Sequence, residues 1–272
     1  MRKLSFLNQR VLITGGASGI GKIMVRKALE KGASHVVIWD LNEEGMQEVK
    51  AEFNKFEGTI HTYKVDLSQS DEIQRAGEAT NALLNGIDIL INNAGIVVGK
   101  YFHEHSSMEI TKTMEINTLA LMRVANCFLP KMIEQNHGAI CNIASQAGLI
   151  ANPKMSVYCA SKWAVIGWSD SLRLELLQLK KEISVTTFMP YYINTGMFDG
   201  VKSSIIPILD PEKATEKIIS SLENRKSLVA IPLPYWFVRL FQGMLPIRVF
   251  DWVMNKVFGI YNSMDNFKGR AK

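Results

Sequence analysis

The sequence is poor in cysteine and has no long apolar run. Its 272 residues contain three cysteines, Cys127, Cys141 and Cys159, and none of them belongs to a CxxC pair. An odd number without such a pair argues against a disulfide framework and makes a reducing compartment the default expectation. No stretch approaches the ~20 consecutive apolar residues that cross a bilayer. We therefore expect a cytoplasmic chain that does not span a membrane.

Three further expectations concern secretion, nucleic-acid binding and metal binding. The amino terminus argues against the first, the charge against the second and the histidines against the third. The first apolar stretch gives way to polar residues at Asn8, which is too short for a signal-peptide core of ~7–15 residues. The net charge of +5 is spread along the chain, and Lys180–Lys181 ends an expected helix, so we expect no nucleic-acid partner. His103 and His105 have no third ligand at helical spacing, so we expect no metal.

Short β-rich runs alternate with longer helical patterns along most of the chain. This alternation predicts an α/β fold, a single Rossmann-type doubly wound parallel sheet with helices on both faces. Strands are expected at 10–14, 36–40, 60–65, 88–91, 139–143, 184–189 and 228–231. Helices are expected from the first glycine turn to about Lys31 and over 42–56, 107–133, 156–179 and 211–222. We predict a dinucleotide-binding catalytic domain over 1–233 and an amphipathic C-terminal extension of the same domain over 234–272.

A glycine-rich turn follows the first expected strand. It reads TGGASGIG over residues 14–21 and opens a helix. Glycines let the backbone approach a pyrophosphate, and the helix N-terminus offers free N–H groups and a partial positive charge. A tight turn without a ligand is the alternative. The position between strand and helix favours a dinucleotide site that includes Gly15, Ser18, Gly19, Ile20 and Gly21.

Acidic residues end the second and third expected strands. Asp40 follows the glycine turn by about twenty residues, where an acid hydrogen-bonds the ribose hydroxyls and repels a 2′-phosphate. A helix cap beside Asn42 is the alternative. Asp66, which is followed by Leu67, is placed to accept a hydrogen bond from the adenine amino group, or else to cap the turn before Ser68. We expect NAD as the cofactor, with NADP disfavoured.

Tyr158 and Lys162 are spaced one helical turn apart in the sequence YCASK. At this spacing both side chains point to one side of the helix. A free tyrosine titrates near ~10, and a nearby cation stabilises the phenolate and lowers its pKa. The tyrosine can then exchange a proton with a substrate oxygen while hydride moves at carbon. The pair therefore predicts acid–base catalysis by Tyr158.

Together with the glycine turn and the NNAG segment at 92–95, this pair resembles the short-chain dehydrogenase/reductase family. The resemblance covers about residues 10–231, and the motifs fall in the order expected of the family. It implies that Tyr158 is the acid/base and that Lys162 lowers its pKa and binds the nicotinamide ribose. It further implies that Ser145 holds the substrate oxygen and that Asn117 anchors a proton-relay water.

The resemblance also implies contacts beyond these motifs. The implied cofactor residues are Asn93, Ala94 and Gly95 after the fourth strand, and Pro190, Ile193 and Thr195 after the sixth. The backbone of Ile193 and the hydroxyl of Thr195 would meet the carboxamide. The glycine usual after this proline is Tyr191 here, which is expected to reshape the pocket wall. Gln146 and Met197 are expected to line the substrate pocket with it.

Three features resemble the lipid-alcohol branch of the family, which includes retinol dehydrogenases and 17β-hydroxysteroid dehydrogenases. They are the Trp39-Asp40 strand end, the sequence NTGMF at 194–198 and the apolar tail. This resemblance implies a bulky apolar alcohol or ketone as the substrate, such as a retinoid, a steroid or another lipid. A homodimer or homotetramer is the expected assembly.

The segment 247–261 has an amphipathic helical pattern. One face carries Arg248, Asp251 and Asn255, and the other carries Phe250, Val253, Met254, Val257, Phe258 and Tyr261. Three interpretations of this segment are open. It packs on its own domain or on a second copy, it forms a flap over an apolar pocket, or it is a helix lying in a membrane surface. Our hypothesis is that it roofs a pocket near Tyr191 and Met197, with peripheral membrane contact as a further option.

Two other functions fit part of the same pattern. A 3-oxoacyl-thioester reductase of fatty-acid metabolism shares the catalytic group but usually takes NADPH, against which Asp40 and the uncharged Ser18 argue. A non-catalytic dinucleotide-sensing regulator usually lacks the tyrosine or the lysine, and both Tyr158 and Lys162 are present. The sequence therefore favours an NAD(H)-dependent short-chain alcohol dehydrogenase or ketone reductase.

Overall fold

A parallel sheet forms the centre of the molecule in the computed structural model, which describes residues 3–203 and 205–269. Its seven strands, all within these residues, lie in the order β3-β2-β1-β4-β5-β6-β7. They are β1 (Arg10–Thr14), β2 (His35–Asp40), β3 (Thr59–Lys64), β4 (Ile89–Asn92), β5 (Gly138–Ile143), β6 (Ile183–Pro190) and β7 (Leu228–Ile231). The order reverses between β1 and β4, and ligands of such sheets bind beyond the carboxyl ends of the strands at this point.

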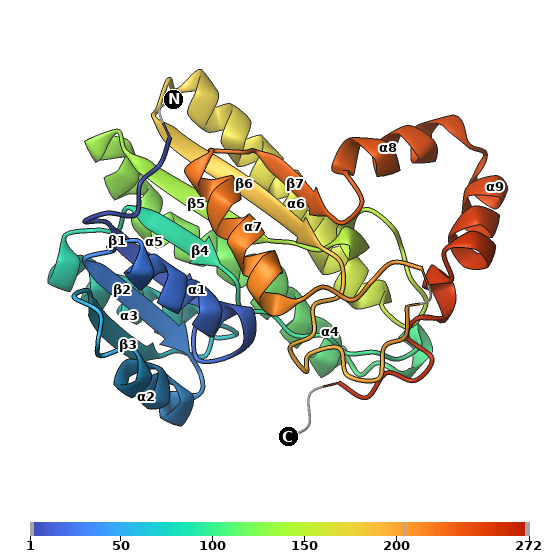
Figure 1. The fold of residues 1–272 in the computed structure, drawn as a ribbon, viewed down its shortest axis with the longest axis horizontal. Coiled ribbons are helices and arrows are strands. Elements are labelled where there is room, and N and C mark those ends of the chain that lie inside the picture. Colours follow the sequence, from blue (N-terminus) through green and yellow to red (C-terminus); the bar gives the residue numbers. More distant parts are fainter. Residues whose placement is uncertain (1–2, 204, 270–272) are drawn as a thin grey trace.

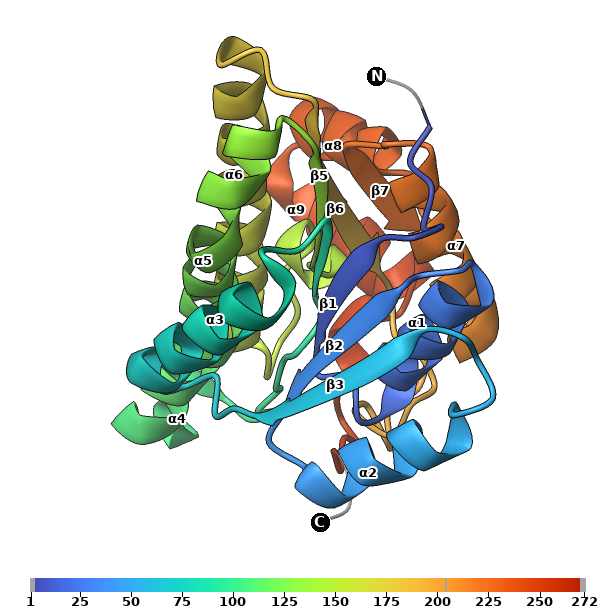
Figure 2. The ribbon, with the colours of Figure 1, turned by 90° about the vertical axis from the view of Figure 1, so that its left-hand side faces the viewer.

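Helices cover both faces of the sheet, which confirms the doubly wound fold (Figures 1 and 2). One face carries α1 (Gly19–Glu30), α2 (Glu43–Glu52) and α7 (Pro211–Glu223). The other carries α3 (Ser70–Leu84), α5 (Ala120–Gln135) and α6 (Ser156–Gln178), with α4 (Ser107–Met114) leading into α5. Each predicted strand agrees with the structure to within one residue at either end.

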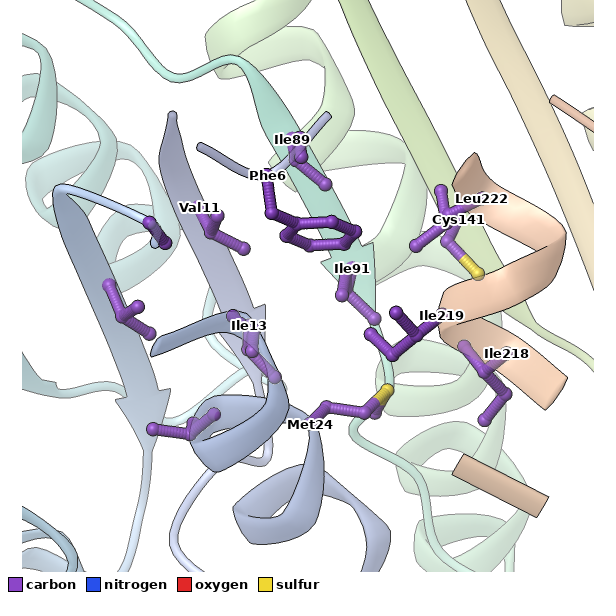
Figure 3. Packing of buried hydrophobic residues seen from close by; sticks show 14 of the residues in the cluster. Phe6, Val11, Ile13, Met24, Ile89, Ile91, Cys141, Ile218, Ile219 and Leu222 are labelled. Atoms are coloured by element: carbon purple, nitrogen blue, oxygen red, sulfur yellow. The ribbon is translucent and has the colours of Figure 1, made fainter. Parts of the chain in front are cut away.

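Two apolar layers hold the helices on the sheet. Figure 3 shows the layer under α1 and α7, where Phe6, Met24 and Ile219 pack against β1 and β4. Every residue of β5 and of β6 is buried, as expected for central strands with helices on both sides. Burying one large apolar side chain stabilises a fold by ~1.5–3 kcal/mol, so these layers hold the sheet and its helices together. The cleft described below lies at the carboxyl ends of the strands.

Helix α3 was not predicted, because its buried stripe is narrow. Only Ile73, Ala76, Gly77 and Thr80 are buried along its length. A Cβ at Gly77 would lie 2.8 Å from the Cys127 sulfur on α5, so the two helices approach closely through small residues. Helix α3 is thus stabilised by contact with α5, which is distant in the sequence. The sequence of α3 itself therefore shows little apolar periodicity.

Two predicted helices differ from the observed ones. The helix expected over 42–56 ends at Glu52, since Phe53 turns into the core and caps it. The helix expected over 107–133 is divided by a π-helical turn, Glu115–Leu119, between α4 and α5. Within that turn Asn117 is hydrogen-bonded to the loop that follows β4. The π-helical turn therefore coincides with the place where the helix contacts this loop.

The C-terminal segment also differs from the single amphipathic helix expected over 247–261. It consists of α8 (Tyr235–Met244), which was not predicted, α9 (Ile247–Trp252), a π-helical turn (Val253–Val257) and a 3-10 turn (Ile260–Asn262). Its inner residues Val238, Phe250, Met254 and Ile260 are buried in a third apolar cluster with residues from the main body. Among the described residues, no helix has the length and apolar character needed to cross a membrane.

Candidate active site

A cleft of about 340 Å³ opens at the carboxyl ends of the strands, where the sheet order reverses. Every site residue expected from the sequence lines it except Asn117. These residues are Gly15, Ser18, Gly19, Ile20, Gly21, Asp40, Asp66, Leu67, Asn93, Ala94, Gly95, Ser145, Gln146, Tyr158, Lys162, Pro190, Tyr191, Ile193, Thr195 and Met197. The fold thus brings side chains from well-separated parts of the chain into one cavity.

The glycine turn presents bare backbone to one end of this cleft. Gly15 has a φ of +70°, in the left-handed region that favours glycine. A Cβ at Gly21 would lie 1.9 Å from the Gly15 carbonyl oxygen, so the first turn of α1 packs directly on the loop. The N-terminus of α1 faces the cleft with backbone N–H groups and a partial positive charge, which fits a phosphate group.

Thr14 at the end of β1 ties the glycine turn to the segment after β4. Its Oγ1 accepts hydrogen bonds from the backbone N–H groups of Asn93 (3.0 Å) and Ala94 (3.1 Å). The Asn93 amide donates in return to the Thr14 carbonyl at 3.0 Å. Thr14 was not among the expected site residues. The sequence does show a hydroxyl side chain at the end of a buried strand. The residues to which that hydroxyl is bonded, however, depend on the order of the strands in the sheet.

Asp40 is held in place at the edge of the cleft. Its Oδ2 accepts from the N–H of Ala17 in the glycine turn at 3.0 Å, and its Oδ1 accepts from the N–H of Asn42 at 2.9 Å. The cap of α2 is Asn42 itself, which accepts from Gly45. Asp40 therefore does not cap the helix, and its carboxylate is fixed against the loop that opens α1.

Asp66 has a clear local role as well as a place in the lining. Its Oδ1 accepts from both the backbone N–H (2.9 Å) and the hydroxyl (2.7 Å) of Ser68. The N-cap residue of α3 is Gln69, so Asp66 stabilises the turn that precedes the helix. Its place in the cleft lining leaves it within reach of a ligand there.

Tyr158 and Lys162 meet at the inner end of the cleft, one turn apart on α6. The Lys162 ammonium lies 5.7 Å from the centroid of the Tyr158 ring, and it donates to the Ile143 carbonyl at 2.9 Å. Burial lowers the pKa of Lys162 to about 8, because its desolvated charge is disfavoured. Gly95 lies beside this pair, since a Cβ at that position would lie 3.7 Å from the same nitrogen and 3.3 Å from the Asn117 Oδ1.

The pKa of Tyr158 is raised by burial, and the expectation that Lys162 lowers it stays a prediction. Burial of the hydroxyl disfavours the phenolate and is the largest effect, while a hydrogen bond with the Ser145 side chain acts in the opposite direction. Phe198 packs edge-on against the ring at 6.0 Å, and the lysine lies over the ring. Tyr158 is therefore a protonated phenol at neutral pH.

Asn117 lies behind the cleft and does not line it. Its Oδ1 accepts from the Ile96 N–H at 2.8 Å, and its Nδ2 donates to the Ile96 carbonyl at 2.8 Å and to the Ser161 hydroxyl at 3.2 Å. Both amide hydrogens are thus used in joining the β4 loop to α6. The side chain of Asn117 is therefore a positioning group in this arrangement, and the role of Asn117 in anchoring a proton-relay water stays a prediction.

The other end of the cleft is aromatic and apolar. Tyr191 and Tyr192 pack with ring centroids 4.6 Å apart, and Phe198 lies 5.0 Å from Tyr192. The Tyr191 hydroxyl is bonded to Ser203 at 3.1 Å, so the side chain that replaces the usual glycine forms a fixed wall. Further lining residues that were not expected include Ile150, Met155 and Ile260.

The C-terminal segment closes this apolar end through buried polar contacts. Asn152 donates to the Tyr192 hydroxyl and to Ser263, both at 2.9 Å, and the Tyr192 and Ser263 hydroxyls lie 3.0 Å apart. Ile260, three residues earlier, reaches the cleft itself. These contacts join residues 40 to 111 positions apart, so no local sequence pattern indicated them.

Comparison with known proteins places these features in a family. A family model described as short chain dehydrogenase matches residues 9–205. Epidermal retinol dehydrogenase 2 from Homo sapiens is 34% identical over 267 residues, covering 96% of this chain and 86% of that protein. Estradiol 17-beta-dehydrogenase 11 from Homo sapiens is 30% identical over 272 residues, covering 100% and 90%.

A solved structure supports the same fold. The short chain dehydrogenase/reductase from Burkholderia phymatum in complex with NAD matches with a TM-score of 0.80 at 21% identity, covering 88% of this chain and 95% of that one. The matched family segment includes the glycine turn, the NNAG segment and the Tyr158–Lys162 pair. The chain belongs to the short-chain dehydrogenase family, as an oxidoreductase of the branch that contains the retinol and estradiol 17-beta-dehydrogenases.

Proposed function

We propose that this protein catalyses NAD(H)-dependent hydride transfer between the nicotinamide and an alcohol or ketone carbon of a bulky apolar substrate. The observation that carries the proposal is that one cleft joins three parts. The glycine turn and Asp40 lie at one end, Tyr158 and Lys162 lie at the inner wall, and an aromatic apolar chamber lies beyond them. Membership of the retinol and 17β-hydroxysteroid branch supports the same substrate class.

The residues present fit a dinucleotide. Gly15 and Gly21 line the cleft without side chains, and α1 directs its N-terminus at the cleft, so a pyrophosphate can approach the backbone. Asp40 would bond the adenosine ribose, and its charge would disfavour a 2′-phosphate. Asp66 and Leu67 would hold the adenine, and Ile193 and Thr195 would hold the carboxamide. When bound, the nicotinamide ring supplies or accepts the hydride.

Tyr158 and Ser145 would act on the substrate oxygen. The Tyr158 hydroxyl is protonated at neutral pH, since burial raises its pKa, so it can donate a proton to a ketone oxygen as hydride arrives at carbon. Ser145, whose side chain acts to lower the pKa of the same hydroxyl, would hold the oxygen in line. Lys162 would bond the nicotinamide ribose, and its positive charge would stabilise the phenolate left after proton transfer.

The apolar chamber supports a bulky substrate. Its lining combines Ile150, Met155, Met197, Phe198 and Ile260 with the rings of Tyr191 and Tyr192. Pockets of this composition gain affinity mainly by removing apolar ligand surface from water. We test the function with purified protein and a panel of short and bulky secondary alcohols and ketones, each with NAD(H) and NADP(H), followed at the nicotinamide absorbance. No turnover with any apolar member would overturn the proposal.

The first prediction concerns cofactor choice. Asp40→Asn should raise the ratio of kcat/KM with NADP to kcat/KM with NAD by about tenfold or more, because a charged hydrogen bond is worth ~1.5–3 kcal/mol and the repulsion of a 2′-phosphate is removed. The carboxamide retains an oxygen for the Ala17 or Asn42 N–H. Asp71→Asn on exposed α3 is the matched control and should leave the ratio unchanged. A native preference for NADP contradicts the assignment of Asp40.

The second prediction concerns the C-terminal roof. Ser263→Ala removes the bonds to Asn152 and Tyr192, each worth ~0.5–1.5 kcal/mol. KM for long apolar substrates should rise by at least roughly 2- to 12-fold, the equivalent of one such bond, since the segment that carries Ile260 is less firmly held. NAD affinity and KM for short substrates should change little. Ser220→Ala on α7 is the control, and an equal rise in KM for substrates of both sizes would contradict the roof.

A further inference from the structure

The C-terminal helices expose an unusually apolar surface, which we call the tail face. It consists of the exposed side chains of α8, α9 and the turn after them: Trp236, Arg239, Leu240, Phe241, Met244, Ile247, Arg248, Val249, Trp252, Lys256 and Val257. Four of its large side chains are mostly exposed, at 66% for Trp236, 71% for Met244, 75% for Ile247 and 60% for Trp252. Contiguous exposed apolar surface usually marks a contact with a partner or a membrane.

The apolar residues of α8 form a stripe that points away from the body. Trp236, Leu240 and Met244 follow one another at intervals of four residues and so lie along one side of the helix. Val238, on the opposite side, is buried in the third apolar cluster. Figure 1 shows α8 and α9 at the edge of the molecule opposite α2, where they extend beyond the sheet. The stripe is therefore presented outward by a helix already anchored by its other side.

The exposed charges on the tail face are of one sign. Among residues 232–262 the exposed charged side chains are Arg239, Arg248 and Lys256, all basic. The acid in this range, Asp251, is half-buried and accepts a hydrogen bond from Tyr261 at 2.5 Å. Arg239 lies over the rings of Trp163 and Tyr235, at 5.8 and 5.4 Å. The face thus combines tryptophan and aliphatic side chains with uncompensated positive charge.

We propose that the tail face docks on the surface of an anionic lipid membrane. An amphipathic surface with aromatic anchors and basic neighbours inserts its apolar side chains at the headgroup boundary while its cations pair with lipid phosphates. A second copy of this chain fits less well. A twofold contact through the tail face would set Arg239, Arg248 and Lys256 against the same residues, with no exposed acid in the face to pair with them.

Docking in this way would give the apolar cleft a source of substrate. The tail face is continuous along the chain with the turn that carries Ile260, which lines the cleft. Only this functional consequence rests on the proposed function, because lipid binding itself requires neither cofactor nor turnover. Failure of the docking and failure of the reaction are therefore measured separately.

The test is cosedimentation of the purified full chain with large vesicles, in the absence of cofactor and substrate. One set contains equal parts phosphatidylglycerol and phosphatidylcholine, and the other contains phosphatidylcholine alone. The protein should bind the anionic vesicles at least tenfold more tightly, and raising the salt to about 0.5 M should weaken that binding because screening shortens the range of the attraction. No binding to the anionic vesicles, or equal binding to both sets, overturns the proposal.

A charge placed in the tail face should abolish this binding. Trp236→Glu combined with Met244→Glu should lower the partition coefficient at least tenfold, with an unchanged circular dichroism spectrum. Leu83→Glu is the matched control, since Leu83 on α3 is 52% exposed and lies outside the tail face. Equal binding by the double variant and by Leu83→Glu overturns the proposal. If the native chain does not bind vesicles and the double variant has a lower oligomer mass than the native chain, the tail face is instead a contact with a second copy.

Discussion

Replacing Tyr158 with Phe should lower kcat by about 10²–10⁴-fold, the contribution typical of a positioned acid or base. The variant removes one hydroxyl and keeps the ring, so the edge contact with Phe198 and the position of Lys162 over the ring persist. The dinucleotide Kd should therefore change little. Steady-state kinetics and direct titration of the cofactor measure the two quantities separately.

Tyr192→Phe is the matched control for this experiment. Tyr192 is also a buried tyrosine of the cleft, but its hydroxyl is engaged with Asn152 and Ser263. We expect this variant to raise KM for bulky substrates and to leave kcat within a few-fold of the native value. If Tyr158→Phe instead retained more than a few per cent of the native kcat, Tyr158 would not be the group that transfers the proton.

Gly21→Ala should sharply weaken dinucleotide binding. The added Cβ would lie 1.9 Å from the Gly15 carbonyl oxygen, which is backbone and cannot rotate away, so the glycine turn must shift. Forcing an extra methyl into a packed site costs about 1–3 kcal/mol, which corresponds to roughly 5- to 150-fold in the dinucleotide Kd. The melting temperature should fall as well, and calorimetric titration and thermal unfolding measure both effects.

Gly167→Ala provides the matched control on α6. A Cβ at Gly167 would meet no atom within 4 Å, and alanine is favoured over glycine within a helix by ~0.5–1 kcal/mol. This variant should keep the native dinucleotide affinity and unfold at a slightly higher temperature. Native affinity in Gly21→Ala would show that the glycine turn does not hold the cofactor.

The strands and the cleft could be predicted from the sequence because the signals are local. Central strands of a parallel sheet are buried on both faces, so β1, β4 and β5 read as short apolar runs. Most of the cleft residues that could be predicted follow such strands closely or lie one helical turn apart on α6. Once the strand order is right, the carboxyl ends meet at one edge, and Asp40 and Tyr158 reach the same cavity without further information.

The parts that could not be predicted depend on contacts between distant segments. Helix α3 is held by a close approach to Cys127, and the π-helical turn adapts to the bonds between Asn117 and Ile96. The raised pKa of Tyr158 comes from burial by several elements at once. Spacing in the sequence indicated that Lys162 is near Tyr158, but not how much solvent the surrounding fold removes from the phenol.

The bonds between Ser263, Asn152 and Tyr192 have a consequence for the order in which the protein matures on the ribosome. Chains emerge from the N-terminus at ~5–20 residues per second and fold by units as they appear. The sheet is complete once β7 (Leu228–Ile231) has emerged, and with it every residue expected at the dinucleotide end. The apolar chamber gains Ile260, and the bonds of Ser263 that hold its segment, only about thirty residues later. A nascent chain can therefore form the glycine-turn end of the cleft before its apolar end, in the interval that these further residues take to emerge.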